Sequence, residues 1–278
     1  MAKKSYADKR KEHLKTYAEK HNINVVRESD GRGYILDFLP GNNDKEKKNN
    51  KRKVVCDSNI LKGVRSDMYE KMSMHALAHH LNSSQVLCYN FFRPLITREG
   101  KPTEEFIKLM WEKIGIQISC NAECRFEYIP ENDMIEKGGK KKRERTNFDF
   151  YIKDGDKEIF FEIKYTESSF GSIKKECRKE CLASYALLFD KQDCVKKIDD
   201  ENIFSRYYQL FRNALRVRSK DKYLVILLPK ENALIERMAK EEFVVNYVEK
   251  YKENIKIVYW EDIVPQDSEL YKKYLAEE

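Results

Sequence analysis

Two apolar-rich arms flank Asp154-Gly155 in the segment TNFDFYIKDGDKEIFFEIKYTES, residues 146–168. Aspartate followed by glycine is the strongest short signal for a tight hairpin turn, and both arms alternate apolar and polar residues. The segment therefore predicts two antiparallel strands of a sheet. Its apolar alternation assigns one face of this hairpin to the core of the protein.

The same alternation gathers charge on the other face. Residues two apart on a strand share a face, as do residues directly opposite each other. A turn at Asp154-Gly155 sets Asp149 opposite Phe160, whereas a turn at Gly155-Asp156 sets it opposite Glu162. Both turns place Asp149, Glu162 and Lys164 on one face. The side chains expected on the opposite, apolar face are Phe148, Phe150, Ile152, Phe161 and Ile163.

Two carboxylates on neighbouring strands would lie roughly 4.5–8 Å apart. They repel each other unless a cation lies between them, and Mg²⁺ suits such a place because it takes oxygen ligands and retains several waters. A solvated polar face with a lysine–carboxylate pair is the alternative interpretation. The apolar run EIFFEIKY favours a central strand, and Phe160 shares the acidic face, so we expect this face to be partly covered.

The rest of the chain predicts a mixed α/β fold, with a central sheet flanked by helices. Residues 1–60 are expected to form a basic N-terminal extension of helix and strand, in which residues 40–53 are a polar loop or linker. Residues 61–278 are expected to form the main domain. Further strands are expected at 120–130, 222–230 and 255–260, and further helices at about 64–93, 102–115, 172–189, 200–218 and 231–240.

Charge and composition restrict the class of partner. The formal net charge is +7, and residues 1–60 carry 15 Lys or Arg against 9 Asp or Glu. A basic balance favours a polyanionic partner, with nucleic acid first. No apolar run approaches the roughly 18 residues of a membrane span, and no apolar segment follows the basic N-terminus, so we expect a cytoplasmic protein without a membrane partner.

The seven cysteines are expected to be reduced thiols in such a compartment. Cys120 and Cys124, and likewise Cys177 and Cys181, are spaced as C-x3-C pairs. A structural zinc or iron–sulfur cluster therefore remains an alternative, although the tight C-x2-C spacing of common zinc sites is absent.

At the hairpin the sequence resembles the PD-(D/E)xK phosphodiesterase superfamily, which has the restriction-endonuclease-like fold. Asp149 on one strand is followed on the next by Glu162-Ile163-Lys164, although Phe148 stands where the superfamily pattern has proline. Over about residues 80–230 the chain resembles one prokaryotic group of restriction-endonuclease-like proteins. The segments that carry this resemblance are SSQVLCYNFFRPL, FEYIP, TNFDFYI and EIKYTES. The resemblance implies an α-β-β-β-α-β core with a mixed central sheet.

The resemblance also implies a function, a Mg²⁺-dependent DNA endonuclease of restriction or genome defence. Asp149, Glu162 and the main-chain carbonyl of Ile163 would hold Mg²⁺ or Mn²⁺, and Lys164 would orient the attacking water or help to deprotonate it. Glu127 is the first candidate for a further acidic ligand, with Glu123 as the second. Three residues are expected as accessory members of the site: Gln85, Glu167 and Gln209.

Nucleic acid would be held by cations around this site. The loop that leads into the first hairpin strand contains four such candidates, which are Lys141, Lys142, Arg143 and Arg145. In the segment 206–220 we expect the aromatic residues on a core face, while its arginines either contact nucleic acid or are solvated. The alternative function is a non-catalytic nucleic-acid-binding protein on a nuclease scaffold. Many double-strand cutters of this fold are dimers, so a homodimer is expected as well.

Overall fold

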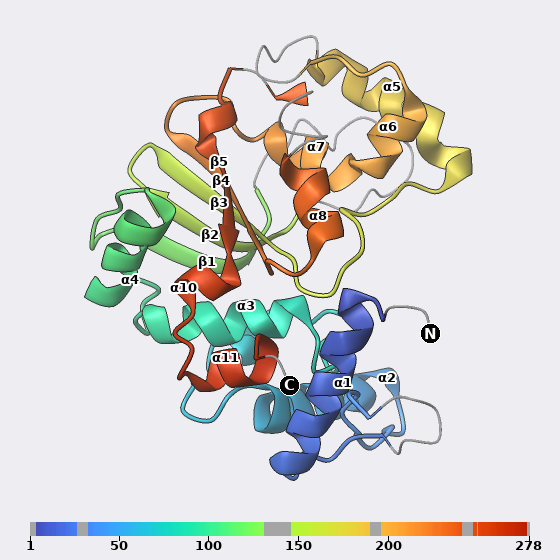
Figure 1. The fold of residues 1–278 in the computed structure, drawn as a ribbon, viewed down its shortest axis with the longest axis vertical. Coiled ribbons are helices and arrows are strands. Elements are labelled where there is room, and N and C mark those ends of the chain that lie inside the picture. The colour runs from blue at the N-terminus through green and yellow to red at the C-terminus, as the bar shows by residue number, and fades with distance from the viewer. Residues whose placement is uncertain are drawn as a thin grey trace. The chain divides into compact units, whose positions relative to one another are not determined.

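The computed structural model describes residues 4–26, 33–130, 146–189, 196–240, 247–248 and 250–276. The chain divides into two compact units, which we name by their content (Figure 1). The helical unit comprises Met1–Cys120 and Trp260–Glu278, and the sheet unit comprises Asn121–Tyr259. Residues 1–60 thus share a unit with the sixty residues that follow them.

The sheet unit contains a five-stranded mixed sheet in the order β1-β2-β3-β4-β5 (Figure 1). Neighbouring strands are antiparallel from β1 to β3 and parallel from β3 to β5. The predicted mixed α/β fold, with its sheet flanked by helices, is confirmed. The apolar run of β4 is buried throughout from Leu224 to Leu228, as expected of a central strand covered on both faces. The strands are β1 (Glu123–Tyr128), β2 (Phe148–Asp154), β3 (Lys157–Ile163), β4 (Lys222–Leu228) and β5 (Ile255–Tyr259).

The register of β2 against β3 decides between the two possible turns. Asp154 pairs with Lys157, and Lys153 pairs with Glu158, so the two turn residues are Gly155 and Asp156. Gly155 has φ +60°. A glycine with positive φ at the first central position is what a type II′ hairpin turn requires, because its twist matches that of the strands.

In the described part of the sheet unit, four helices share one buried core with the strands. Leu210 and Phe211 of α7 lie in one buried cluster with Phe160, Leu224 and Ile226 of the strands. The prediction that the aromatic residues of segment 206–220 face the core is confirmed for this helix. The helices are α5 (Arg178–Phe189), α6 (Glu201–Arg206), α7 (Tyr208–Ala214) and α8 (Ala233–Arg237).

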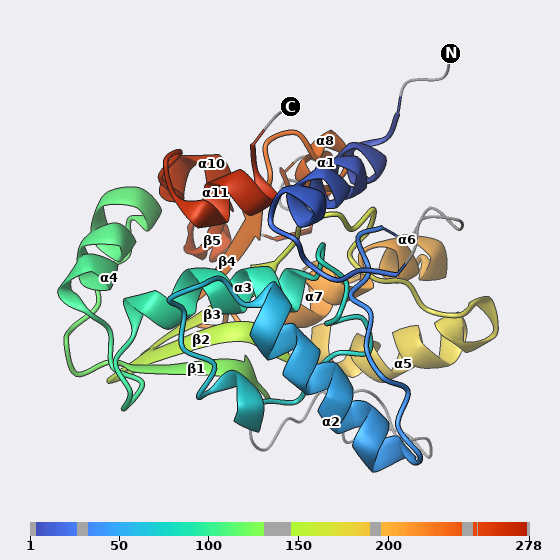
Figure 2. The same cartoon turned by 90° about the horizontal axis from the view of Figure 1, so that it is seen from below.

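The helical unit is built from six α-helices in the described part of the chain: α1 (Tyr6–Lys20), α2 (Asp44–Val54), α3 (Ser84–Phe92), α4 (Glu104–Leu109), α10 (Trp260–Ile263) and α11 (Glu269–Tyr274). α11 lies beside α1 (Figure 2). Arg10 donates a hydrogen bond of 2.8 Å to the carbonyl of Ala276, and the His13 ring lies 2.9 Å from the carbonyl of Lys272. None of the helices in the described ranges has the length and apolar character that a bilayer crossing requires.

The prediction of a loop or linker at residues 40–53 is wrong, because most of that segment forms α2. The side chain of Asn43 caps this helix by accepting from the Glu46 main-chain N–H at 3.0 Å. Acidic residues lie in its first turn and basic residues in its last turn, which suits the helix dipole. α2 has no buried residue, so it lacks the apolar periodicity by which a helix is usually predicted.

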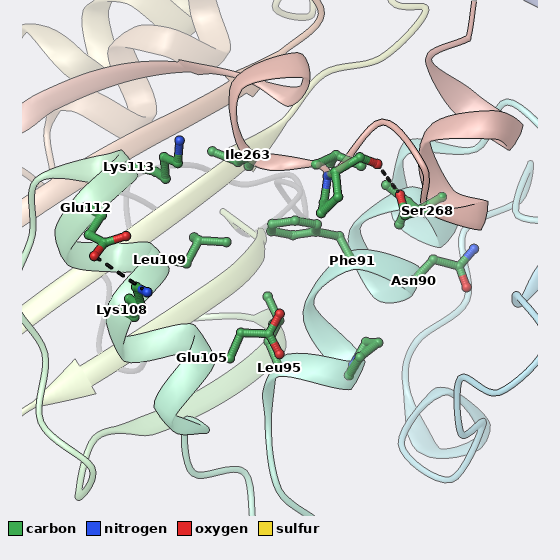
Figure 3. Close-up of a pocket in the computed structure, with 14 residues that line it drawn as sticks. Asn90, Phe91, Leu95, Glu105, Lys108, Leu109, Glu112, Lys113, Ile263 and Ser268 are labelled. Carbon is green, nitrogen blue, oxygen red and sulfur yellow. Dashed lines mark hydrogen bonds and ion pairs between the residues drawn. The ribbon is translucent and has the colours of Figure 1, made fainter.

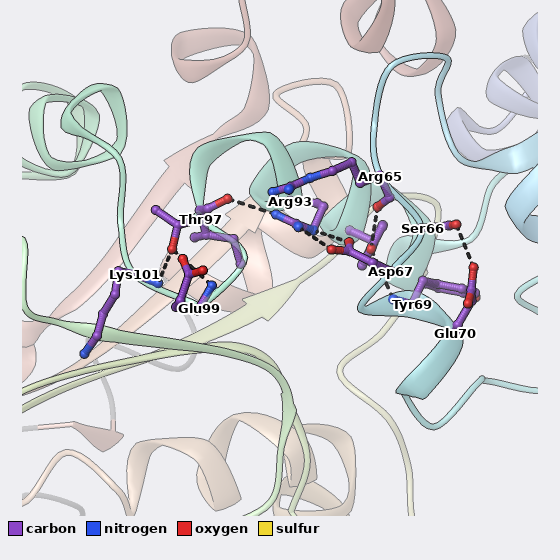
Figure 4. A network of polar contacts seen from close by, with 11 residues as sticks. Arg65, Ser66, Asp67, Tyr69, Glu70, Arg93, Thr97, Glu99 and Lys101 are labelled. Carbon is purple, nitrogen blue, oxygen red and sulfur yellow. Dashed lines mark hydrogen bonds and ion pairs between the residues drawn. The ribbon is translucent and has the colours of Figure 1, made fainter.

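A polar network ties the end of α3 to the segment that precedes it (Figure 4). Arg93 is buried, and its guanidinium donates to both carboxylate oxygens of Asp67 at 2.9 Å and to the carbonyl of Ile96 at 2.9 Å. Its hydrogen bonds hold the pKa of Asp67 below its ordinary value. The bidentate geometry makes this a directional link between two parts of the helical unit.

A buried lysine of α11 gives the helical unit a pH-dependent stability. Lys273 Nζ lies 2.6 and 2.8 Å from the main-chain and side-chain oxygens of Asn59, beside the rings of Tyr17 and Tyr274. Burial lowers its pKa from 10.5 to about 7. Between these two values the unfolded chain binds a proton that the folded chain has released, so stability rises with pH across this window.

We therefore expect the wild-type melting temperature to rise between pH 7 and pH 9.5 relative to that of Lys273→Met, which has no such proton. Circular dichroism at several pH values measures both curves. Parallel curves would contradict the assignment of this proton to Lys273.

Candidate active site

The hairpin of β2 and β3 brings two of the predicted site carboxylates to facing positions. Phe150 pairs with Phe161, and the same register continued by one residue sets Asp149 opposite Glu162. At this end of the hairpin the main-chain N–H of Ile163 donates to Asp149 Oδ2 at 2.7 Å. Asp149 is half-buried, and its side chain is fixed against the neighbouring strand.

Glu162 and Lys164 form a buried ion pair, with Lys164 Nζ 2.9 Å from Glu162 Oε1 and about 5% of each side chain exposed. Lys164 Nζ also donates to Gln209 Oε1 at 2.9 Å and lies 5.2 Å from the centre of the Phe170 ring. The second oxygen of Glu162 accepts from Asn213 Nδ2 at 2.9 Å. Two side-chain amides therefore fix the two charged groups from opposite ends.

Both amides come from α7. Gln209 and Asn213 are four residues apart, so they lie on one face of this helix, while Leu210, Phe211 and Ala214 face the core cluster. Gln209, an accessory candidate from the sequence, contacts the predicted site. Sequence reasoning missed Asn213, although its helical spacing from Gln209 is a signal that could have found it.

Glu127, the first candidate for a further acid, lies at an irregularity of β1. It has φ +49°, and its carboxylate accepts a hydrogen bond from the Asn147 side chain. The next residue, Tyr128, stacks on Tyr151 with ring centroids 3.7 Å apart. Tyr151 shares the face of Asp149, so the left-handed residue turns Tyr128 onto that face and ends the regular alternation.

The prediction that Phe148 lies on the apolar face of the hairpin is wrong, because the regular alternation ends at this point of the sheet. Its ring lies 4.7 Å from that of Phe160, centroid to centroid, so it packs on the face expected to be acidic. Phe148 begins β2 and pairs with Tyr128, the residue that follows the irregular Glu127. Where the ladder ends, the alternation no longer fixes the direction of a side chain.

The carboxylates of the site repel one another. Burial and the charges of Glu162 and Glu127 raise the pKa of Asp149 well above its ordinary value. The hydrogen bond from Ile163 and the charge of Lys164 act in the opposite direction and do not outweigh them. Among the described residues, the carboxylates of the site therefore carry more negative charge than Lys164 compensates.

Lys164 is held in its charged form. Burial alone would lower its pKa, but the carboxylates of Glu162 and Glu167 outweigh burial and raise this pKa above its ordinary value. Glu167 lies in the loop after β3, where its carboxylate accepts from the Tyr165 N–H at 2.6 Å. Asn232 holds the same loop by donating to the carbonyl oxygens of Tyr165 and Glu167 at 3.2 and 2.9 Å.

The oxygen atoms of the site suit a hard divalent cation. Asn213 Oδ1 and Asn147 Oδ1 are sealed from solvent without a hydrogen-bond partner in the described structure, and each amide nitrogen already donates to a carboxylate. Excess negative charge and unpartnered oxygens are features that Mg²⁺ compensates. No group of three or more His, Cys, Asp or Glu in the described ranges is ready to hold a metal, so water or other oxygens would have to complete the coordination.

The remaining candidates lie outside this group of contacts. Glu123 pairs with Arg125 at 2.9 Å on an exposed part of β1. Gln85 belongs to the helical unit, where it donates to the carbonyl of Ser73 at 2.8 Å and accepts from the His75 N–H at 3.0 Å. The basic candidates Lys141, Lys142, Arg143 and Arg145 lie outside the described residues. None of the six described cysteines, which are all except Cys194, forms a disulfide bond.

The helical unit contains a pocket of about 410 Å³ between the end of α3, α4 and the segment from α10 to α11 (Figure 3). Phe91, Leu109 and Ile263 contribute apolar walls, and Lys108 and Glu112 form an exposed pair of 3.9 Å at one side. The pocket contains none of the residues predicted for the site.

Comparison with known families gives one match over nearly the whole chain. A family model described as "Restriction Endonuclease associating with ARP" matches residues 6–277. No curated protein and no solved structure gives a significant match. The matched range includes the hairpin and the helix that contacts it.

Proposed function

The chain belongs to the family of restriction endonucleases described as associating with ARP, and from this premise we propose that it is a Mg²⁺-dependent DNA endonuclease acting in restriction or genome defence. We assign its active site to Asp149, Glu162 and Lys164, an arrangement of the PD-(D/E)xK type. The observation that carries this proposal is the buried Glu162–Lys164 pair beside Asp149, on the two strands of one hairpin.

The burial of an ion pair seldom stabilises a protein, so the burial of Glu162 and Lys164 suggests a role in function. Removing two charges from water costs several kcal/mol per ion, at order of magnitude, and replacement by apolar residues is often neutral or stabilising. Such a pair beside a second carboxylate with a raised pKa is typical of a catalytic site. The fixed geometry from Gln209 and Asn213 supports the same interpretation.

Asp149 and Glu162 would hold Mg²⁺ or Mn²⁺, with the Ile163 carbonyl and Glu127 as further oxygen donors. When bound, the metal would polarise the scissile phosphate and stabilise the charge that develops on it. The hydrogen bond from the Ile163 N–H keeps the Asp149 carboxylate in place for this role.

Lys164 would act as a cation and a hydrogen-bond donor. Its raised pKa keeps it an ammonium at neutral pH, and an ammonium accepts no proton from water. Of the two roles that the family resemblance implies, we therefore favour the orientation of water or of a phosphate oxygen over deprotonation. Gln209 and the Phe170 ring fix the direction of Nζ.

The experiment is a cleavage assay on supercoiled plasmid, single-stranded DNA and RNA with Mg²⁺, with Mn²⁺ and with EDTA. We expect metal-dependent cleavage of duplex DNA by the wild type. In Lys164→Ala we expect a loss of about 100- to 1000-fold, the usual effect of removing one donor that stabilises a transition state. Lys153→Ala is the matched control, because Lys153 is an exposed lysine of the same hairpin.

Equal cleavage by the wild type, Asp149→Ala and Lys164→Ala would overturn the proposal. Binding of nucleic acid without cleavage under every metal condition would instead support the alternative of a non-catalytic binding protein on this scaffold.

A further inference from the structure

α7 carries a third polar residue beside the two that contact the site. Arg212 lies three residues after Gln209 and directly before Asn213, so the helical period places it on the same side of α7. It is only 8% exposed. The arginines of segment 206–220 were expected either to contact nucleic acid or to be solvated. Arg212 does not fit the second alternative, because most of its side chain is buried.

Among the residues that the structure describes, no carboxylate forms an ion pair with the guanidinium of Arg212. Its Cζ lies 5.3 Å from the centre of the Tyr208 ring. Within the described part of the chain it forms no ion pair or hydrogen bond, and its Nε is sealed from solvent without a partner. The two Nη atoms are not sealed in this way, so the outer edge of the guanidinium retains access to solvent. A charge that is mostly buried and uncompensated is unfavourable unless an anion completes it.

Two hydroxyl groups accompany this guanidinium. The hydroxyls of Tyr185 and Tyr208 lie 3.4 Å apart, and Tyr185 is fully buried. Burial raises the pKa of Tyr185, and the nearby charge of Arg212 lowers it by less. The hydroxyl therefore keeps its proton and can donate a hydrogen bond. A planar guanidinium next to neutral hydroxyl donors is suited to phosphate oxygens, which accept several hydrogen bonds at once.

We propose that Arg212 binds a backbone phosphate of the nucleic acid next to the scissile bond, with the hydroxyls of Tyr185 and Tyr208 as additional donors. This inference rests on the proposed function. If the scissile phosphate lies at Glu162 and Lys164, the next phosphates along the nucleic acid lie at the adjacent side of α7. A phosphate contact does not read base identity. Arg212 should therefore support the binding of every sequence alike.

The test is fluorescence anisotropy of a labelled DNA duplex in EDTA, where cleavage does not interfere. Arg212→Met keeps most of the side-chain volume and removes the charge, and Arg212→Lys keeps the charge. We expect Arg212→Met to weaken binding by about tenfold for several unrelated sequences and to reduce the slope of log K against log salt by about one. Arg212→Lys should recover part of the affinity.

The control is Arg237→Met, which removes an exposed arginine from α8 of the same unit. Its dissociation constant should stay within about twofold of the wild type, since an exposed cation away from the site contributes little. Thermal unfolding of each variant checks folding. Arg212→Met should melt no lower than the wild type, because it removes an uncompensated buried charge.

The inference is overturned if a folded Arg212→Met binds DNA with the wild-type dissociation constant and salt slope. Weakened binding with an unchanged slope would also overturn it, since the loss would then be structural. If the wild type cleaves no substrate but Arg212→Met still loses affinity and slope, the phosphate site stands and the endonuclease proposal fails.

Discussion

Asp149→Asn is expected to yield a protein that does not cleave DNA and is more stable than the wild type. Burial and the charges of Glu162 and Glu127 raise the pKa of Asp149 well above its ordinary value. At pH values between the ordinary pKa of the unfolded chain and the raised pKa of the folded chain, the folded chain holds a proton that the unfolded chain has released. Stability is therefore lost as pH rises through the raised pKa, and the full penalty applies above it. An asparagine removes this penalty together with the proposed metal ligand.

The measurement combines melting curves with the cleavage assay. In EDTA the wild type should lose stability relative to Asp149→Asn as pH rises from 4 to 8. Each kcal/mol gained corresponds to about 2–4 °C for a protein of this size. Mg²⁺ should raise the melting temperature of the wild type and not that of the variant, because a ligand stabilises only a state that binds it.

Asp156→Asn provides the matched control, since Asp156 is an exposed carboxylate in the turn of the same hairpin. It should change neither cleavage nor the response to Mg²⁺. A variant Asp149→Asn that melts below the wild type, or that still cleaves, would contradict the role assigned to this carboxylate.

The hairpin was predictable because its signals are local. Asp-Gly and the alternating arms lie within one short segment, and their pattern alone groups Asp149, Glu162 and Lys164 on one face. The choice of turn was not predictable, because either glycine-containing pair is compatible with the pattern. The register, in which Asp154 pairs with Lys157, decides it.

The partners of the charged group depend on distant parts of the chain. Gln209 and Asn213 are separated by 45 and 51 residues from the groups that they contact. Their roles follow only when α7 is packed against the sheet, which local patterns do not specify. Glu127 is a different case, because a left-handed φ at a residue other than glycine has no sequence signal.

The charged helix α2 shows a third limit. Hydrophobic periodicity detects helices by the face that they bury, and α2 buries none of its residues. Its remaining signals are the Asn43 cap and the ordering of charge from acidic to basic. Those signals are weak against a polar composition that equally suits a loop.

The largest effects on stability are expected from separating Glu162 and Lys164. Lys164→Met removes the ammonium 2.9 Å from the buried Glu162 carboxylate, and Glu162→Gln removes that carboxylate from the buried ammonium. Breaking a buried pair in this way costs about 3–5 kcal/mol. The double variant has no buried charge at these positions, so its stability should return to within about 1 kcal/mol of the wild type. All three variants should be inactive.

Denaturant unfolding of the four proteins gives the coupling energy. We expect its magnitude to be about 5–10 kcal/mol, because two single losses of about 3–5 kcal/mol each are absent from the double variant. The control cycle uses Glu158→Gln and Lys222→Met, which separate a partly exposed ion pair between β3 and β4 of the same sheet. Its coupling should stay below about 1 kcal/mol, and its variants should keep cleavage. Equal coupling energies in the two cycles would contradict the prediction that burial strengthens the Glu162–Lys164 interaction. Cleavage by the double variant would show that the chain retains this pair for a reason other than chemistry.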